Sequence, residues 1–171
     1  GVVYRLQGKG TFVAGAKLVQ PLMQVTGFTE DMQRRGKIPS SRLLYAGVQK
    51  ANHIIASDLG IGLGQDYILI RRLRFADGVP LAIEETALSY ELCSALLDDD
   101  IAHGSIYGRL RQMGIKLITG EQYMEATLAD SEQAELLQIE RGAAVMHIER
   151  HVCSEQGIPV EATYSTYRGD Q

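Results

Sequence analysis

Tryptophan is absent from this chain of 171 residues, cysteine occurs twice, and proline occurs four times. Cys93 and Cys153 lie far apart without a metal-ligand spacing, and a chain of this length can bury a core without disulfides, so we expect both to be reduced. There is no apolar run long enough to span a bilayer, and no signal-peptide pattern. These absences argue against a secreted disulfide scaffold and a membrane protein, and they favour a cytoplasmic location.

Several chemical signatures are also missing. The sequence has no phosphate loop, no dinucleotide fingerprint and no nucleophile elbow, so we expect no cofactor and no catalytic residues. His147 and His151 share a strand face but lack an apparent third ligand, so no metal site is expected. The net charge is −4, with 22% charged and 45% hydrophobic residues. Bulk composition therefore indicates an ordinary globular domain and gives no reason to expect a nucleic-acid partner.

The first residues are the exception to this acidic balance. Tyr4 to Leu6 and Thr11 to Val13 are short β-type runs around a Gly-Lys-Gly tip, which is typical of a tight hairpin. Arg5 and Lys9 in this hairpin suit contacts with DNA phosphates or base edges. Since an isolated hairpin is marginal in water, we interpret it as the last piece of a preceding domain.

The rest of the chain alternates helical and strand patterns. Thr26 or Thr29 is a possible cap of the first helix, while Asn52 and Asp130 are expected to cap two later ones. The pattern predicts an α+β fold with a six-stranded, mainly antiparallel sheet and flanking helices. The expected helices are 26–36, 52–60, 90–97, 105–113 and 130–137, and the expected strands are 39–50, 66–76, 80–89, 115–129, 143–154 and 159–168.

A faint internal repeat relates the two halves of the chain. Similar residues return after 78 positions in nine pairs, and the shared unit is a helix, a strand, a capped helix and a long hairpin. The sequence therefore predicts two pseudo-duplicated halves about a pseudo-twofold axis, whose junction is a natural place for a ligand. The pairs are Gly36 and Gly114, Tyr45 and Tyr123, Asn52 and Asp130, Ala56 and Ala134, Leu59 and Leu137, Ile61 and Ile139, Gly64 and Gly142, Ile70 and Ile148, and Arg72 and Arg150.

A series of short segments, together rather than singly, resembles the UTRA domain, the small-molecule sensor of the HutC branch of GntR-type bacterial transcription regulators. The resemblance implies a fold like that of chorismate lyase. It also implies that residues 1–14 are the wing end of a winged helix-turn-helix domain, 15–26 a linker, and 27–171 the sensor. The segments are Gly27 to Met32, Arg72 to Pro80, Glu84-Glu85, Gly104 to Tyr107, Glu125-Ala126 and Tyr167 to Asp170.

Arg72 and Arg74 are two apart on a predicted strand, so they project from one face, while Arg71 points the other way. Two adjacent guanidinium groups suit a phosphate or carboxylate. Taken alone, the residues favour the simpler interpretation, an exposed strand face paired with Glu84 or Glu85. The family pattern reverses this preference, because UTRA sensors of phosphorylated sugars place an Arg-x-Arg pair on the phosphate.

The hairpin turn decides which glutamate accompanies these arginines. A three-residue loop, Asp77 to Val79, places Arg72 directly across from Glu84, whereas a two-residue turn places Glu84 on the opposite sheet face, across from Arg71. We favour the longer loop, with Arg72 and Glu84 on one face.

The remaining candidates are read together with the resemblance. Phe28 and Thr29 lie at the start of one predicted helix, and Ser105 and Tyr107 lie at the start of another. Exposed amides at a helix N-terminus attract anions, although each residue taken singly also fits a capping or core role. The resemblance assigns Thr29, Ser105 and Tyr107, with the two arginines, to the phosphate. It assigns Glu84, Glu161 and Tyr167 to the sugar end.

We therefore expect a non-enzymatic, dimeric effector-binding domain of a transcriptional repressor, with operator DNA as a partner through the winged-helix domain. N-acetylglucosamine 6-phosphate or glucosamine 6-phosphate is the first candidate effector. The alternatives are a sensor of urocanate or a fatty acid, a chorismate-lyase-like enzyme in which Arg72 and Glu84 serve an anion site, and a dimerisation module without a ligand.

Overall fold

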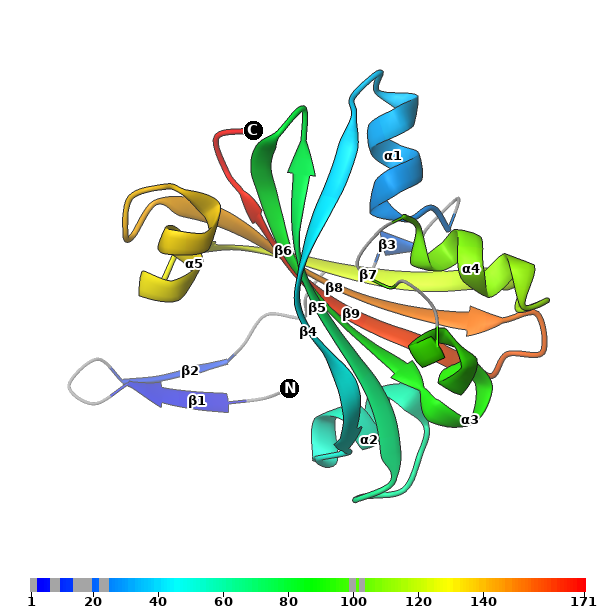
Figure 1. Cartoon of the computed structure of the whole chain (residues 1–171). Coiled ribbons are helices and arrows are strands. Elements are labelled where there is room, and N and C mark those ends of the chain that lie inside the picture. Colours follow the sequence, from blue (N-terminus) through cyan, green and yellow to red (C-terminus); the bar gives the residue numbers. More distant parts are fainter. Residues whose placement is uncertain (1–2, 7–9, 14–19, 22–24, 99–100, 102–103) are drawn as a thin grey trace.

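The structure is a computed structural model that describes residues 3–6, 10–13, 20–21, 25–98, 101 and 104–171. Its centre is an antiparallel sheet in the order β3-β7-β8-β9-β6-β5-β4 (Figure 1). Six long strands fulfil the sequence prediction, and a two-residue strand in the predicted linker adds a seventh. The strands are β3 (Gln20–Pro21), β4 (Pro39–Lys50), β5 (Asp66–Ala76), β6 (Val79–Ser89), β7 (Leu117–Leu128), β8 (Ala144–Ser154) and β9 (Pro159–Arg168).

Helices cover both faces of this sheet. Figure 1 shows α1 and α4 beside each other over one face. α2 and α5 pack on the other, against β9 and β6. The region predicted as one helix from Tyr90 divides into a helical turn and a 3₁₀ turn. The bounds are α1 (Phe28–Arg34), α2 (His53–Leu59), α3 (Tyr90–Cys93), the 3₁₀ turn η1 (Ser94–Asp98), α4 (Ile106–Gln112) and α5 (Ser131–Leu137).

The two halves repeat each other closely. α1, β4, α2 and β5 each return 78 positions later as α4, β7, α5 and β8, with the same lengths. Asn52 and Asp130 accept hydrogen bonds from the third residue of α2 and α5, as predicted for caps. Such a cap contributes about 0.5–2 kcal/mol. The strands β6 and β9 pair at the centre, so the pseudo-twofold axis passes between them.

One predicted cap is wrong. Gly27, and neither Thr26 nor Thr29, is the N-cap residue of α1, and its N–H donates to Glu30. The Thr29 hydroxyl instead accepts a hydrogen bond from Arg74.

The core lies where helices meet the sheet. The largest cluster packs α3, η1 and α4 on the α1 side, and smaller clusters lie beneath α2 and α5. Ile68 and Ile70 on β5 are fully buried in the first cluster. Because side chains alternate along a strand, Arg72 and Arg74 continue this buried face. The two arginines are therefore buried because they lie on the same face of β5 as these apolar residues.

At the other end of the chain, β1 (Val3–Leu6) pairs with β2 (Gly10–Val13), which confirms the predicted hairpin. Figure 1 shows it standing apart from the main sheet. No helix among the described residues is long and apolar enough to cross a membrane. Cys93 and Cys153 are both free.

Candidate functional site

A cavity of about 230 Å³ lies between the starts of α1 and α4 and the facing strands of the sheet. It sits where the two halves meet, as the repeat predicts. All nine residues singled out for ligand binding line it, although their separation in sequence is large. They are Phe28, Thr29, Arg72, Arg74, Glu84, Ser105, Tyr107, Glu161 and Tyr167.

Arg72 and Arg74 form the cationic floor of the cavity with Glu84. The side chain of Arg72 is 4% exposed, and its Nη2 lies 2.5 Å from Glu84 Oε1; Arg74 Nη1 lies 3.7 Å from the same oxygen. Burial opposes the ionisation of Glu84, but the charges of both arginines outweigh it and hold the pKa of this carboxyl below its usual range. One carboxylate thus faces two buried cations.

The register that brings them together arises in an unexpected way. Asp77 and Gly78 form a two-residue turn with positive φ at both positions, so the expected three-residue loop is wrong. A bulge at Leu81 then shifts the pairing by one residue, and Arg72 pairs with Glu84 after all. The predicted side-chain arrangement is confirmed, but its cause is the bulge.

Arg74 is enclosed on several sides. Its guanidinium carbon lies 4.5 Å from the ring centroid of Phe28, its Nη2 donates to Thr29, and the Phe28 ring packs against Tyr167 at 6.5 Å. Burial lowers the pKa of Arg74 to about 10, which leaves it charged at neutral pH. Within the described part of the chain, Arg74 Nε and Nη1 and Arg72 Nε have no hydrogen-bond partner. Buried, unpaired N–H groups of this kind suit an anionic ligand.

On the same sheet face as Arg72 and Glu84, β9 carries Glu161, which is 3% exposed. The hydroxyl of Thr163 donates to its Oε1, while Oε2 has no hydrogen-bond partner among the described residues. Burial raises the pKa of Glu161, and it raises that of the neighbouring Tyr107 hydroxyl well above the usual value. Burial also raises the pKa of Tyr167 to about 12. This part of the cavity therefore presents a carboxyl group and two phenol hydroxyls, which can accept from and donate to ligand hydroxyls.

At the start of α4, both interpretations of Ser105 hold, whereas Thr29 reaches the cavity without capping α1. Ser105 Oγ accepts a hydrogen bond from the Gly108 N–H and so caps α4, while the residue also lines the cavity. Its hydroxyl hydrogen remains available as a donor. Thr29 and Tyr107, which are equivalent under the 78-residue shift, both reach the cavity, so the two helix starts converge as expected.

Arg150 is the main residue that the sequence analysis missed. It lies on β8, lines the cavity, and donates to Gln122 and to the Thr26 carbonyl, both of which also line the cavity. The sequence did contain a signal, because Arg150 stands 78 positions after Arg72 in the repeat. If one member of the pair faces the junction of the halves, the pseudo-twofold axis brings the other there too.

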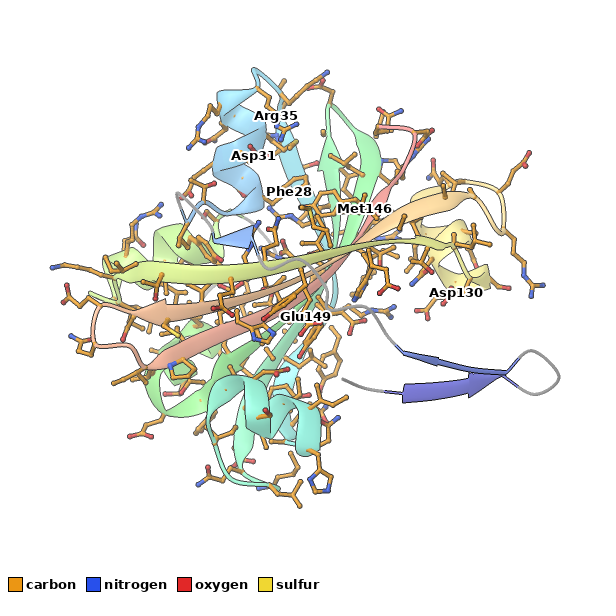
Figure 2. All side chains as sticks on the ribbon, turned by 180° about the vertical axis from the view of Figure 1, so that it is seen from behind. Phe28, Asp31, Arg35, Asp130, Met146 and Glu149 are labelled. Atoms are coloured by element: carbon orange, nitrogen blue, oxygen red, sulfur yellow. The ribbon has the colours of Figure 1, made fainter. Side chains whose placement is uncertain are left out.

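Two further charged residues lie at the rim. Asp31 and Arg35 also line the cavity, and they form an exposed ion pair of 3.0 Å one helical turn apart. Figure 2 shows them along α1, with Phe28 at the end of the helix next to the sheet.

A separate group of titratable residues lies on the other sheet face. Ligand-type atoms of Asp58, Glu149 and His151 come within 4.8 Å of one another. This group does not include His147, so it is not the His147–His151 pair considered in the sequence, and the expectation of no metal site stays a prediction. Internal contacts already connect the group, because His151 Nε2 lies 2.9 Å from Glu149 Oε1 and the Tyr164 hydroxyl donates to Asp58.

The predicted DNA contacts remain predictions. Lys9 lies outside the described residues, and for Arg5 the structure gives only its backbone position on β1.

A polar cavity between two pseudo-equivalent halves, lined by buried arginines and by a buried carboxyl group with an unpaired oxygen, defines a small-molecule-binding α+β domain. The family model of the UTRA domain matches residues 34–171. The chain therefore belongs to the UTRA family, the effector domains of GntR-type transcription regulators of the HutC branch.

Curated relatives agree with this assignment. The transcriptional repressor NagR of Bacillus subtilis is 37% identical over 172 residues, which cover 100% of this chain and 70% of NagR. The histidine utilization repressor of Pseudomonas putida is 31% identical, with 100% of this chain and 68% of the repressor covered. The effector domain of PhnF from Mycobacterium smegmatis has a TM-score of 0.81 at 23% identity, covering 85% of this chain and 90% of that domain, and shows the same fold.

Proposed function

We propose that this chain is the effector-sensing and dimerisation domain of a transcriptional repressor, and that its cavity binds a small phosphorylated metabolite, an amino-sugar phosphate. The observation that carries the proposal is the pair of buried arginines, Arg72 and Arg74, which line the cavity and have N–H groups without a hydrogen-bond partner among the described residues. Two cations with one shared carboxylate leave a net positive charge there, which a phosphate offsets.

The phosphate end is assigned to the wall made by α1, α4 and β5. Arg72 and Arg74 offer charge-assisted hydrogen bonds, and the hydroxyls of Thr29 and Ser105 lie on the same cavity. Arginine suits this task because its planar fork matches phosphate oxygens in a bidentate manner.

The sugar end is assigned to Glu84, Glu161 and Tyr167. The free Oε2 of Glu161 accepts from a sugar hydroxyl or an amide N–H, and the Tyr167 ring supplies an apolar face. The cavity volume of about 230 Å³ lies below the range of about 300–1,000 Å³ that is typical for drug-sized ligands. A compact sugar phosphate therefore suits it better than a fatty acid.

In this proposal, the effector changes operator affinity because it binds one conformation of the regulator more tightly than another. A coupling of about 1–3 kcal/mol changes operator occupancy several-fold or more. Exposed Ile118, Met124 and Leu128 on β7 supply apolar surface for a second copy of the chain, which supports the dimerisation part.

The test is thermal unfolding of this chain against a panel of N-acetylglucosamine 6-phosphate, glucosamine 6-phosphate, glucose 6-phosphate, urocanate, a long-chain acyl-CoA and inorganic phosphate. A ligand at 100 times its dissociation constant stabilises by about 2.7 kcal/mol, or roughly 5–11 °C for a domain of this size. Arg74→Ala should abolish the shift. Arg71→Ala is the matched control, because Arg71 lies on the same strand but faces the other way, toward Glu85 and Glu132.

A shift with urocanate or the acyl-CoA alone would refute the phosphate site while leaving a sensor. No shift with any compound would favour a dimerisation module. Pyruvate release from chorismate should be absent on the same protein, and sustained turnover would contradict the regulatory assignment.

A further inference from the structure

Arg150 connects the cavity to the segment that leads into α1. Its Nη1 donates to the Thr26 carbonyl at 2.9 Å, and its Nε and Nη2 donate to Gln122 Oε1 at 3.2 and 2.9 Å. Thr26 directly precedes Gly27, the N-cap residue of α1. One cavity side chain therefore fixes the entrance of the helix that carries Phe28 and Thr29.

Gln122 attaches the same segment at a second point. It lies on β7, where its backbone is paired with Gln20 of the short strand β3. Gln20 and Thr26 are thus both linked to the Gln122–Arg150 pair, one through the backbone and the other through the guanidinium. We call this set, Thr26, Gln122 and Arg150, the linker clasp, because it lies within the predicted linker and the cavity wall next to it.

The pseudo-twofold axis shows that the clasp is half of a repeated device. Arg72 Nη1 donates to the Gly104 carbonyl at 3.3 Å, and Gly104 precedes Ser105, the N-cap residue of α4. Since Thr26 and Gly104 are also separated by 78 positions, each half supplies the arginine that holds the helix entrance of the other half. One of these arginines, Arg72, belongs to the proposed phosphate site.

Arg150 also faces the proposed sugar end. Burial works against its charge, yet Tyr107, Glu161 and Tyr167 together raise its pKa above the usual value. A ligand that fills the cavity excludes water from this guanidinium. Hydrogen bonds strengthen in a less polar environment, so the hold on Thr26 should tighten.

We propose that Arg150 is the positioning residue through which occupancy of the cavity is transmitted to the segment before α1, by way of the linker clasp. The proposal rests on the proposed function, because it needs a ligand in the cavity. It assigns to Arg150 a role in the response to the ligand rather than in its capture. The predicted outcome is ligand-dependent protection from hydrogen exchange near Gln20 and Thr26 that requires this side chain.

The experiment is amide hydrogen exchange of a peptide covering residues 20–28, measured by mass spectrometry with and without glucosamine 6-phosphate. Allosteric couplings of ordinary size correspond to about 5- to 150-fold changes. We expect the ligand to slow exchange about fivefold or more in the wild-type chain. In Arg150→Gln the slowing should vanish even at ligand concentrations that calorimetry shows to saturate this variant.

Two variants control the measurement. Arg71→Gln removes a guanidinium from the other sheet face and should retain the ligand-induced slowing. Arg150→Lys keeps the charge but cannot hold Gln122 and Thr26 with one planar fork, so it should recover only part of the slowing. Circular dichroism checks that each variant is folded.

The possible failures are distinct. If Arg150→Gln binds the ligand and its 20–28 peptide is still protected, the transmission role is wrong and the proposed function stands. If the variant loses binding and protection together, Arg150 is a ligand contact and the positioning role is also overturned. If the wild-type chain binds neither glucosamine 6-phosphate nor its N-acetyl form, the proposed ligand class fails, and this inference fails with it.

Discussion

Glu84→Gln tests the electrostatics of the cavity without changing the shape of the side chain. The carboxylate is 11% exposed and lies 2.5 Å from Arg72 and 3.7 Å from Arg74. Breaking a buried ion pair by removing one partner costs about 3–5 kcal/mol, because uncompensated charge is left behind. For a domain of this size we expect the unfolding midpoint to fall by roughly 6–20 °C.

Glu85→Gln is the matched control. Glu85 is the next residue on β6, but its side chain is 43% exposed and pairs with Arg71 on the other face. Exposed pairs contribute about 0–1 kcal/mol, so this variant should unfold close to the wild-type midpoint.

Inorganic phosphate sharpens the test. If the arginines form an anion site, phosphate replaces the missing carboxylate charge, and it should raise the midpoint of Glu84→Gln more than that of the wild-type chain. At 100 times its dissociation constant it supplies about 2.7 kcal/mol, which is more than half of the smaller expected loss. Differential scanning calorimetry in phosphate and in an uncharged-buffer control measures both effects. Equal midpoints for Glu84→Gln and Glu85→Gln, or equal phosphate shifts in variant and wild type, would refute the reasoning.

Two further predictions concern stability. Burial raises the pKa of Glu161, so its contribution to wild-type stability is lost as the pH rises from the ordinary glutamate value, about 4.3, through the higher folded-state value. Glu161→Gln should lack this loss, and its stability in urea unfolding should increase relative to the wild type over that interval. Gly169→Ala should destabilise by about 1–3 kcal/mol, because a Cβ would lie 2.5 Å from the Ala144 carbonyl oxygen. Gly108→Ala, inside α4 with only ordinary contacts, should stabilise by about 0.5–1 kcal/mol, and opposite signs in denaturant melts check the pair.

Much of the fold could be predicted because local signals repeat. Asn52 and Asp130 identify helix starts by their side chains alone, and the 78-residue period relates element after element. The two-residue strand β3 had no such signal, since its pairing depends on Gln122, which lies about a hundred residues further along the chain.

The site was harder to predict in one respect. The sequence contains Leu81, but no local property marks it as the bulge that sets the Arg72–Glu84 register. Arg150 appeared in the repeat without a role, because its partners, Gln122 and the Thr26 carbonyl, meet only after both halves have folded. Every residue has a backbone carbonyl, so the residue type does not indicate which carbonyl accepts a hydrogen bond. Sequence reasoning therefore finds the cations of a cavity more readily than the groups that orient them.

The position of the cavity on a pseudo-twofold axis affects which orientation a bound ligand can take. Two identical halves would offer a sugar phosphate two equivalent poses, and a sensor with such a pocket would bind its effector either way round. The poses become unequal only where the two halves differ. At positions related by the 78-residue shift, Arg74 corresponds to Val152 and Thr29 corresponds to Tyr107. The strand partner of Arg72 is Glu84, whereas the strand partner of Arg150 is Thr163. The differences between the two halves therefore make the two ends of the cavity chemically unequal, and the proposed phosphate and sugar ends depend on that inequality.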